Sequence, residues 1–163
     1  MKIDASRLSR RDAADVDRVL AYDIKKAALR AYVEPIWGWD ESFQVEFHRK
    51  DWAEVRPQFI RMDGREIGTI EIRRNSGSFH LGEFYLLPEF QRQGIGSHFL
   101  SQLTVRADDE GIPVRLDVIR INPVQTLYRR FGFVIVGETR THYLMERTPN
   151  PARRSASPLQ TSS

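Results

Sequence analysis

The junction between a strand and a helix in the middle of the chain constrains the fold most. Residues Ser78–Leu87 are predicted to form a strand that Pro88 ends, because proline donates no hydrogen bond to a strand ladder. The helical period then predicts a helix over Gly94–Asp109, with Ile95, Phe99 and Leu103 on its inner face. The chain therefore passes from a strand into the first turn of a helix within a few residues, which favours an α/β fold.

The start of this helix is predicted to bind an anion. The first four amide groups of a helix have no partner inside it, and the helix dipole adds positive potential there. Gly94 and Gly96 carry no Cβ that would keep a phosphate away from the backbone, and Arg92 adds a full charge. An ordinary tight strand–helix turn would show the same two glycines. A Walker loop is excluded because no Gly-Lys-Ser/Thr follows, and the dinucleotide-binding glycine pattern is incomplete.

The remaining segments alternate between the strand and helix periods. An Asp63-Gly64 hairpin turn is predicted, Glu34-Pro35 is predicted to end the first helix, and Asp40 to cap the second. The resulting order βααβββαβαββ predicts a mixed α/β (α+β) sheet with helices on both faces. Strands are expected at Ile3–Leu8, Gln58–Met62, Glu66–Arg73, Ser78–Leu87, Val114–Ile121, Phe133–Gly137 and His142–Glu146, and helices at Asp12–Val33, Asp40–Lys50, Gly94–Asp109 and Pro123–Phe131.

Composition limits the domain organisation and the compartment. The 163 residues, 40% of them hydrophobic, suffice for one core, which we place at residues 1–148. Residues 149–163 are rich in Pro and Ser and are expected to be a disordered tail. The chain has no cysteine, which fits the cytoplasm and excludes a disulfide-stapled fold. No segment approaches about 20 apolar residues, so no membrane span is expected.

Charge argues against a nucleic-acid partner. The net charge is +3, from 25 basic and 22 acidic residues. Without Arg153 and Arg154 of the tail, 25 − 2 = 23 basic residues face 22 acidic ones, so the body is near neutral. A nucleic-acid-binding protein using Arg73, Arg74, Arg115 and Arg120 is the least favoured class. No spacing of His48 or His142 indicates a metal site.

Two blocks of sequence carry a resemblance to a known family. The segment Gln91-Arg-Gln-Gly94-Ile-Gly96, after Leu86-Leu-Pro-Glu-Phe, resembles the Gln/Arg-x-x-Gly-x-Gly/Ala signature of the GNAT superfamily of N-acetyltransferases. The segment Asn122-Pro-Val-Gln-Thr-Leu-Tyr128-Arg-Arg-Phe-Gly132-Phe133 looks like the family's second block, with Val124 where the family often has Ala. The resemblance covers roughly Ile3 to Arg147.

This resemblance implies a fold, a cosubstrate and its binding residues. The sheet would be mostly antiparallel, with six to seven strands, and splayed between the fourth and fifth. Acetyl-CoA would place its pyrophosphate on the backbone amides of the turn and its pantetheine arm between the splayed strands. The residues implied are Leu86, Leu87, Gln91, Arg92, Gln93, Gly94, Ile95, Gly96, Ser97, Asn122 and Tyr128.

The expected reaction is direct attack of an amine on the thioester in a ternary complex. Tyr128 is the candidate acid for the leaving sulfur, at the position where the family's Tyr faces that atom. Glu83, His80 and Asp117 compete for the role of base. A regular strand points Glu83 to the face opposite His80, although a bulge would turn it back. Each of these residues also has an ordinary structural interpretation, and a water relay would leave no single base essential.

The acceptor is expected to contact the first two helices. Their junction is dense in aromatic rings and acids, which suits a cationic amine; the residues are Tyr32, Glu34, Trp37, Trp39, Asp40 and Glu41. The same tryptophans could instead anchor the helices to the core. The sequence identifies the acceptor no further than as an amine of a small molecule or of a peptide or protein. It also leaves open whether the protein forms a homodimer. The alternative function is a CoA-binding regulatory module without catalysis.

Overall fold

The computed structural model describes residues 3–152. Within them the chain forms two compact units: residues 3–72 with 81–98, and residues 73–80 with 99–152. Strand β4 (Phe79–Leu86) and helix α3 (Ile95–Glu110) contribute residues to both units. The part of the predicted tail from residue 153 onward lies outside the described residues. In its described part, the backbone N–H of Asn150 donates to Asp108 Oδ1 at 2.7 Å.

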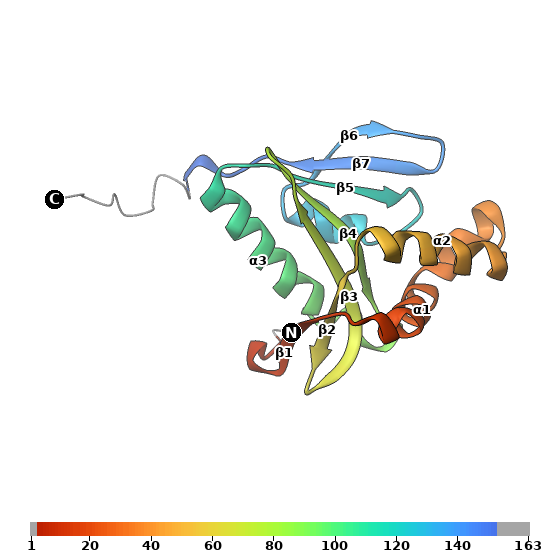
Figure 1. Cartoon of the computed structure of the whole chain (residues 1–163). Helices are drawn as coiled ribbons and strands as arrows, with labels where there is room; N and C mark the ends of the chain where they lie inside the picture. The colour runs from red at the N-terminus through yellow and green to blue at the C-terminus, as the bar shows by residue number, and fades with distance from the viewer. Residues whose placement is uncertain (1–2, 153–163) are drawn as a thin grey trace. The chain divides into compact units, whose positions relative to one another are not determined.

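The strands form one mixed sheet of seven strands in the order β1-β2-β3-β4-β5-β7-β6 (Figure 1). Pairing is antiparallel for β1–β2, β2–β3, β5–β7 and β6–β7, and parallel for β4–β5, with Phe79 opposite Val114. The predicted mixed, mostly antiparallel sheet is confirmed. The remaining strands are β1 (Leu8–Asp12), β2 (Gln58–Met62), β3 (Arg65–Arg74), β5 (Val114–Ile119), β6 (Val134–Glu138) and β7 (His142–Arg147).

The hairpin between β2 and β3 forms at the predicted dipeptide. Asp63 and Gly64 both have positive φ, at 51° and 82°, as a two-residue turn that matches the strand twist requires. Met62 and Arg65 pair directly across it. Asp63 also accepts a bidentate ion pair from Arg7, the shortest contact being 2.6 Å. The turn therefore fixes the register of this edge of the sheet.

Three predictions at the N-terminal end are wrong, one of them the helix start at Asp12, which lies in β1, while α1 begins at Arg18. The first strand is β1, not Ile3–Leu8, because the Asp4 side chain accepts the Ser6 N–H and winds Ala5–Arg7 into a 3₁₀ turn. Helix α1 runs over Arg18–Trp37 and contains Pro35, which was predicted to end it. Pro35 lies in the last turn, so its missing N–H removes one helical hydrogen bond just before the helix ends. The helix ends instead at Gly38, with φ 71° and its N–H donated to Glu34 O at 2.8 Å.

The second helix begins as predicted. Asp40 accepts the N–H of Phe43 at 3.0 Å and caps α2 (Glu41–Glu54). Helices α1 and α2 pack on the sheet of the first unit through a buried cluster, and partly buried side chains surround this cluster. The buried residues of the cluster are Ala21, Ile24, Trp52 and Phe59. This packing fixes the face of α1 that carries the polar groups discussed below. Among the described residues no helix has the length and apolarity that crossing a bilayer requires.

In the second unit, a buried ion pair ties helix α3 to strand β7. Arg147 donates to both oxygens of Asp108, at 2.7 and 3.0 Å, and its Nε donates to Phe131 O at 2.7 Å. The side chains are 13% and 6% exposed. Because both charges are removed from water, the pair depends on these hydrogen bonds.

We expect Asp108→Ala to destabilise the protein by about 3–5 kcal/mol, because it leaves the Arg147 charge buried without its partner. The measurement is the free energy of unfolding in urea. The control is Glu46→Ala, which removes the exposed partner of Arg49 and should cost only about 0–1 kcal/mol. Equal effects of the two substitutions would contradict the assignment of a buried, structural pair.

Candidate functional site

The backbone between β4 and α3 forms an open turn. A 3₁₀ turn at Pro88–Phe90 follows the strand, and α3 begins at Ile95. Between them Arg92 and Gly94 have positive φ, at 62° and 85°. The first amides of α3 have no partner inside the helix, and left-handed residues can turn successive N–H groups toward one concavity. The turn can thus present amide groups to an anion.

Side chains hold this turn from both sides. Gln91 Nε2 donates to Leu86 O at 2.9 Å, and Gln93 Nε2 donates to Glu89 O at 2.8 Å. Both residues were predicted to bind the cofactor, and their side chains here stabilise the loop. Arg92 is exposed, and its side chain has no ion-pair partner among residues 3–152. An exposed positive charge without an ion-pair partner therefore belongs to the same loop as these amides.

The backbone of Leu86 and Leu87 is already engaged. The Leu87 N–H donates to Ile67 O at 2.9 Å, and Leu87 O accepts the Phe90 N–H at 2.9 Å. Leu86 O accepts from the Gln91 side chain. Carbonyl oxygens have a second lone pair, so these groups can still accept a further bond. The role of both residues toward a pantetheine arm stays a prediction.

Strand β4 is irregular at Glu83. This residue has φ 44°, a left-handed conformation that is uncommon for a residue with a side chain. Thr69 Oγ1 donates to Glu83 O at 2.7 Å and holds the irregular peptide. The Glu83 carboxylate lies 3.4 Å from Lys25 Nζ of α1. One oxygen of the side chain thus makes a long polar contact with α1.

The sequence analysis did not single out Lys25. Its place in α1 looks like one more polar position on an amphipathic helix, yet it is buried, as is His48 of α2. His48 Nε2 lies 3.0 Å from Arg18 O, and burial lowers the pKa of its imidazole below 6.5. No sequence signal marks the pairing, because Lys25 and Glu83 are 58 positions apart.

His80 and Asp117 belong to the second unit. His80 is half-buried, and its buried Nδ1 has no hydrogen-bond partner among the described residues. Burial, with Arg73 as the next cause, lowers the pKa of the imidazole, while Asp117 opposes this. Asp117 itself is exposed on β5. Of the two, His80 has the environment of a neutral nitrogen base.

Tyr128 lies on α4 (Gln125–Arg130) and is buried. Its ring packs against Phe133 with centroids 5.7 Å apart. Burial raises the pKa of the phenol well above its ordinary value of about 10, so the hydroxyl keeps its proton at neutral pH. A protonated phenol can donate a proton or a hydrogen bond.

Asn122 and Gln125 shape the start of α4. Asn122 Oδ1 accepts the Val124 N–H at 3.0 Å, a local turn of the kind asparagine favours. Gln125 Nε2 lies within hydrogen-bonding distance of Arg120 O at 2.6 Å, and of two further carbonyls. Gln125 was missed by the sequence analysis. These bonds fix the helix that carries Tyr128.

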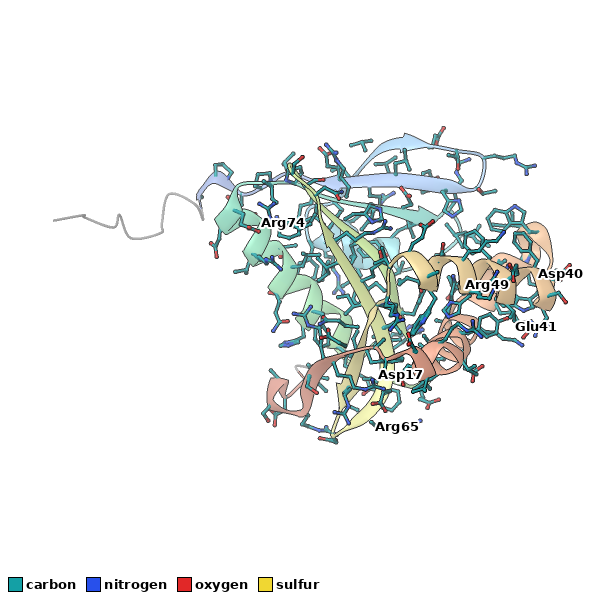
Figure 2. All side chains as sticks on the ribbon, viewed as in Figure 1. Asp17, Asp40, Glu41, Arg49, Arg65 and Arg74 are labelled. Atoms are coloured by element: carbon teal, nitrogen blue, oxygen red, sulfur yellow. The ribbon has the colours of Figure 1, made fainter. Side chains whose placement is uncertain are left out.

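The predicted acceptor segment is dominated by local contacts. Glu34 pairs with Arg30 at 3.3 Å, while Glu41 accepts from Trp39 Nε1 at 2.7 Å and from Lys26 at 3.0 Å. Figure 2 shows Asp40 and Glu41 at the N-terminal end of α2. The hydrogen bond from Trp39, then that from Lys26, lowers the pKa of Glu41. Trp37 is exposed and Tyr32 half-buried. Binding of an acceptor here stays a prediction.

Comparison with known proteins identifies the family. The model of the acetyltransferase (GNAT) domain matches residues 39–146. The chain therefore belongs to the GNAT acetyltransferase family, as the two sequence blocks indicated. A search of curated proteins finds no significant match. Among the described residues, no group of three or more His, Asp or Glu side chains could hold a metal ion.

Solved structures share the fold at low identity. PaiA N-acetyltransferase from Thermoplasma acidophilum, in complex with coenzyme A, is 20% identical with a TM-score of 0.69, covering 86% of this chain and 98% of that one. The ribosomal-protein-S18-alanine N-acetyltransferase of Escherichia coli is 18% identical (TM-score 0.62; 86% and 93%). Arabidopsis thaliana Naa50, in complex with the bisubstrate analogue CoA-Ac-MVNAL, is 16% identical (TM-score 0.61; 87% and 99%).

The depressed pKa of His80 predicts a pH dependence of stability. The unfolded chain takes up a proton near pH 6.5 more readily than the folded protein, so the free energy of unfolding falls as pH is lowered below this value. His80→Gln should lessen the loss of stability between pH 7.5 and 5.5, as measured by urea unfolding at each pH. An unchanged pH slope would show that His80 is as easily protonated in the folded protein as in the unfolded chain.

Proposed function

We propose that this protein transfers an acetyl group from acetyl-CoA to a primary amine of a small molecule, peptide or protein. The observation that carries the proposal is the turn at the start of α3, where left-handed Arg92 and Gly94 precede the free amides of the helix. Family membership and the coenzyme A complex of the T. acidophilum relative support acetyl-CoA as the donor. The E. coli and A. thaliana relatives support a peptide or protein amine as one class of acceptor.

The turn fits the diphosphate of acetyl-CoA. The Gln91 N–H donates to Pro88 O at 3.2 Å, so in the proposal the backbone amides of Arg92–Ser97 donate to the phosphate oxygens, and Gly94 and Gly96 leave room for them. Hydrogen bonds to a charged group contribute about 1.5–3 kcal/mol each, so a few amides suffice. Arg92 adds its unpaired charge, and the Gln91 and Gln93 side chains keep the loop in shape.

The transfer requires two proton movements. When bound, acetyl-CoA supplies the thioester carbonyl; a C–N bond forms, a C–S bond breaks, and the amine proton leaves. In the proposal Tyr128 gives its proton to the departing sulfur, since burial keeps its phenol protonated. A lysine-like amine is neutral in only about 1 part in 2,500 at pH 7, against about one in ten for a peptide α-amine. A base is therefore most needed for alkylamines.

We assign the role of base to His80. Its imidazole is kept neutral by burial, and its Nδ1 has no partner among residues 3–152. Glu83 is engaged by Lys25, and Asp117 is exposed. A regulatory protein that binds CoA without catalysis is the second candidate, and a screen of amines that monitors CoA release separates the two.

Acetyl-CoA should raise the melting temperature of the protein. At 100 times its dissociation constant it should add about 2.7 kcal/mol to the stability, because it binds the folded state alone. Gly94→Glu should abolish the shift, since it places a carboxylate where the phosphate would bind. Gly64→Glu, at another left-handed glycine, should lower the melting temperature and keep the shift. The donor assignment fails if saturating acetyl-CoA leaves the wild-type melting temperature unchanged.

Tyr128→Phe should lower kcat by about 10²–10⁴-fold, the usual contribution of general acid catalysis. The melting shift with acetyl-CoA should remain, since the ring is retained. Tyr143→Phe on β7 is the matched control and should keep its turnover rate. If the Tyr128 variant turns over at the wild-type rate with saturating substrates, the thiolate leaves without help from this residue.

A further inference from the structure

An ion pair between the buried Lys25 of α1 and the half-buried Glu83 of β4 has unused hydrogen-bonding capacity. Lys25 and Glu83 are 9% and 15% exposed in their side chains, and Nζ lies 3.4 Å from Oε1. An ammonium group has three N–H donors, and a carboxylate can accept several bonds. Among the described residues, Glu83 is the one hydrogen-bond partner of Lys25, and Lys25 is the one side-chain partner of Glu83. Glu83 Oε2 is not among the fully buried atoms without a partner, so a ligand can reach the free side of the carboxylate.

The geometry of the pair also differs from that of a purely structural contact. Charge-assisted hydrogen bonds usually measure about 2.7–2.9 Å, so this separation is long. Glu83 is held in its left-handed conformation by Thr69, and residues held in such sparsely populated conformations concentrate at functional sites. The backbone therefore fixes the position of Glu83, while the contact between the Lys25 and Glu83 side chains is long.

An exposed aromatic surface adjoins the pair. Lys25 Nζ lies 5.4 Å from the centre of the Phe47 ring, and Phe47 stacks on Phe43 with centroids 6.1 Å apart. The two phenylalanines follow each other by one turn of α2 and are 47% and 61% exposed. An apolar group that covered these rings would lie next to the charged groups of Lys25 and Glu83.

We propose that Lys25, Glu83 and Phe47 bind an α-aminoacyl group, which makes the acceptor an amino-acid derivative or a peptide N-terminus with an apolar first side chain. This rests on the proposed acetyltransferase function. The Glu83 carboxylate accepts from the amine, and the Lys25 ammonium donates to the neighbouring carbonyl oxygen. The nitrogen and carbonyl oxygen of one residue lie roughly 3 Å apart. This spacing suits the Glu83 carboxylate and the Lys25 ammonium, which lie 3.4 Å from each other. Phe47 packs against the side chain.

Lys25 gives this site its selectivity. A simple alkylamine would meet the Glu83 carboxylate but also the like charge of Lys25, and would offer it no acceptor oxygen. An α-aminoacyl group uses both partners, because its carbonyl satisfies the ammonium. Glu83 thus orients the amine, while the proton is taken by another group.

The test compares two acceptors that differ by one carboxamide group, phenylalanine amide and 2-phenylethylamine, with the full-length protein and acetyl-CoA. The measured quantity is the ratio of their kcat/KM values in the wild type and in Lys25→Met. Because the two amines differ in basicity, only the change of this ratio between proteins is interpreted. We expect the substitution to lower the ratio about tenfold or more, the usual effect of losing a hydrogen bond to a charged group. Lys25→Arg should retain most of it.

Lys50→Met, which removes an exposed lysine of α2, is the control and should leave the ratio unchanged. The melting shift with acetyl-CoA shows that each variant is folded. If Lys25→Met does not fold, Glu83→Gln replaces it as the test variant and should raise KM for both amines. An unchanged ratio in an active, folded Lys25→Met variant overturns the inference and makes the pair structural. Absence of CoA release with any amine, in the wild type itself, would instead contradict the proposed function.

Discussion

The backbone of the segment from β4 to α3 leaves the right-handed and extended regions at Glu83, Arg92 and Gly94, and the rest of the site depends on these three positions. At Arg92 and Gly94 the change of direction opens the N-terminus of α3, so that amides without helical partners face outward. At Glu83 it redirects a carboxylate from a regular strand position toward Lys25 of α1. In the two proposals, one stretch of chain therefore supplies both the site for the diphosphate and the carboxylate for the amine.

Burial then sets the protonation of the side chains assigned to the chemistry. The phenol of Tyr128 stays protonated because burial penalises its anion, and the imidazole of His80 stays neutral because burial penalises its cation. In the proposal the protonated phenol gives a proton to the departing sulfur, and the neutral imidazole takes one from the amine. Both protonation states follow from burial of the side chain within the second unit.

Local patterns predicted the parts of the fold that depend on nearby residues. Asp63-Gly64 indicated its hairpin, Asp40 its cap, and Gly94 the start of α3, because each acts within a few residues. At Glu83 the sequence left a regular strand and a bulge as alternatives and could not decide between them, since the left-handed conformation is held by Thr69 of a neighbouring strand. Lys25 was missed because its partner Glu83 lies 58 positions away in the sequence. Pro35 misled because the helix continues for only two residues beyond it, so the proline marks the end of α1 without being its last residue.

The central claim is that the turn before α3 binds a diphosphate through its backbone, and one measurement tests it without catalysis. Adenosine 3′-phosphate 5′-diphosphate, the nucleotide half of CoA, is titrated into the ¹⁵N-labelled protein while amide resonances are followed by NMR. The account predicts that the largest shifts fall on the amides of Arg92–Ser97, with saturation. Saturable binding that leaves these amides unmoved, or no binding at all, would contradict it.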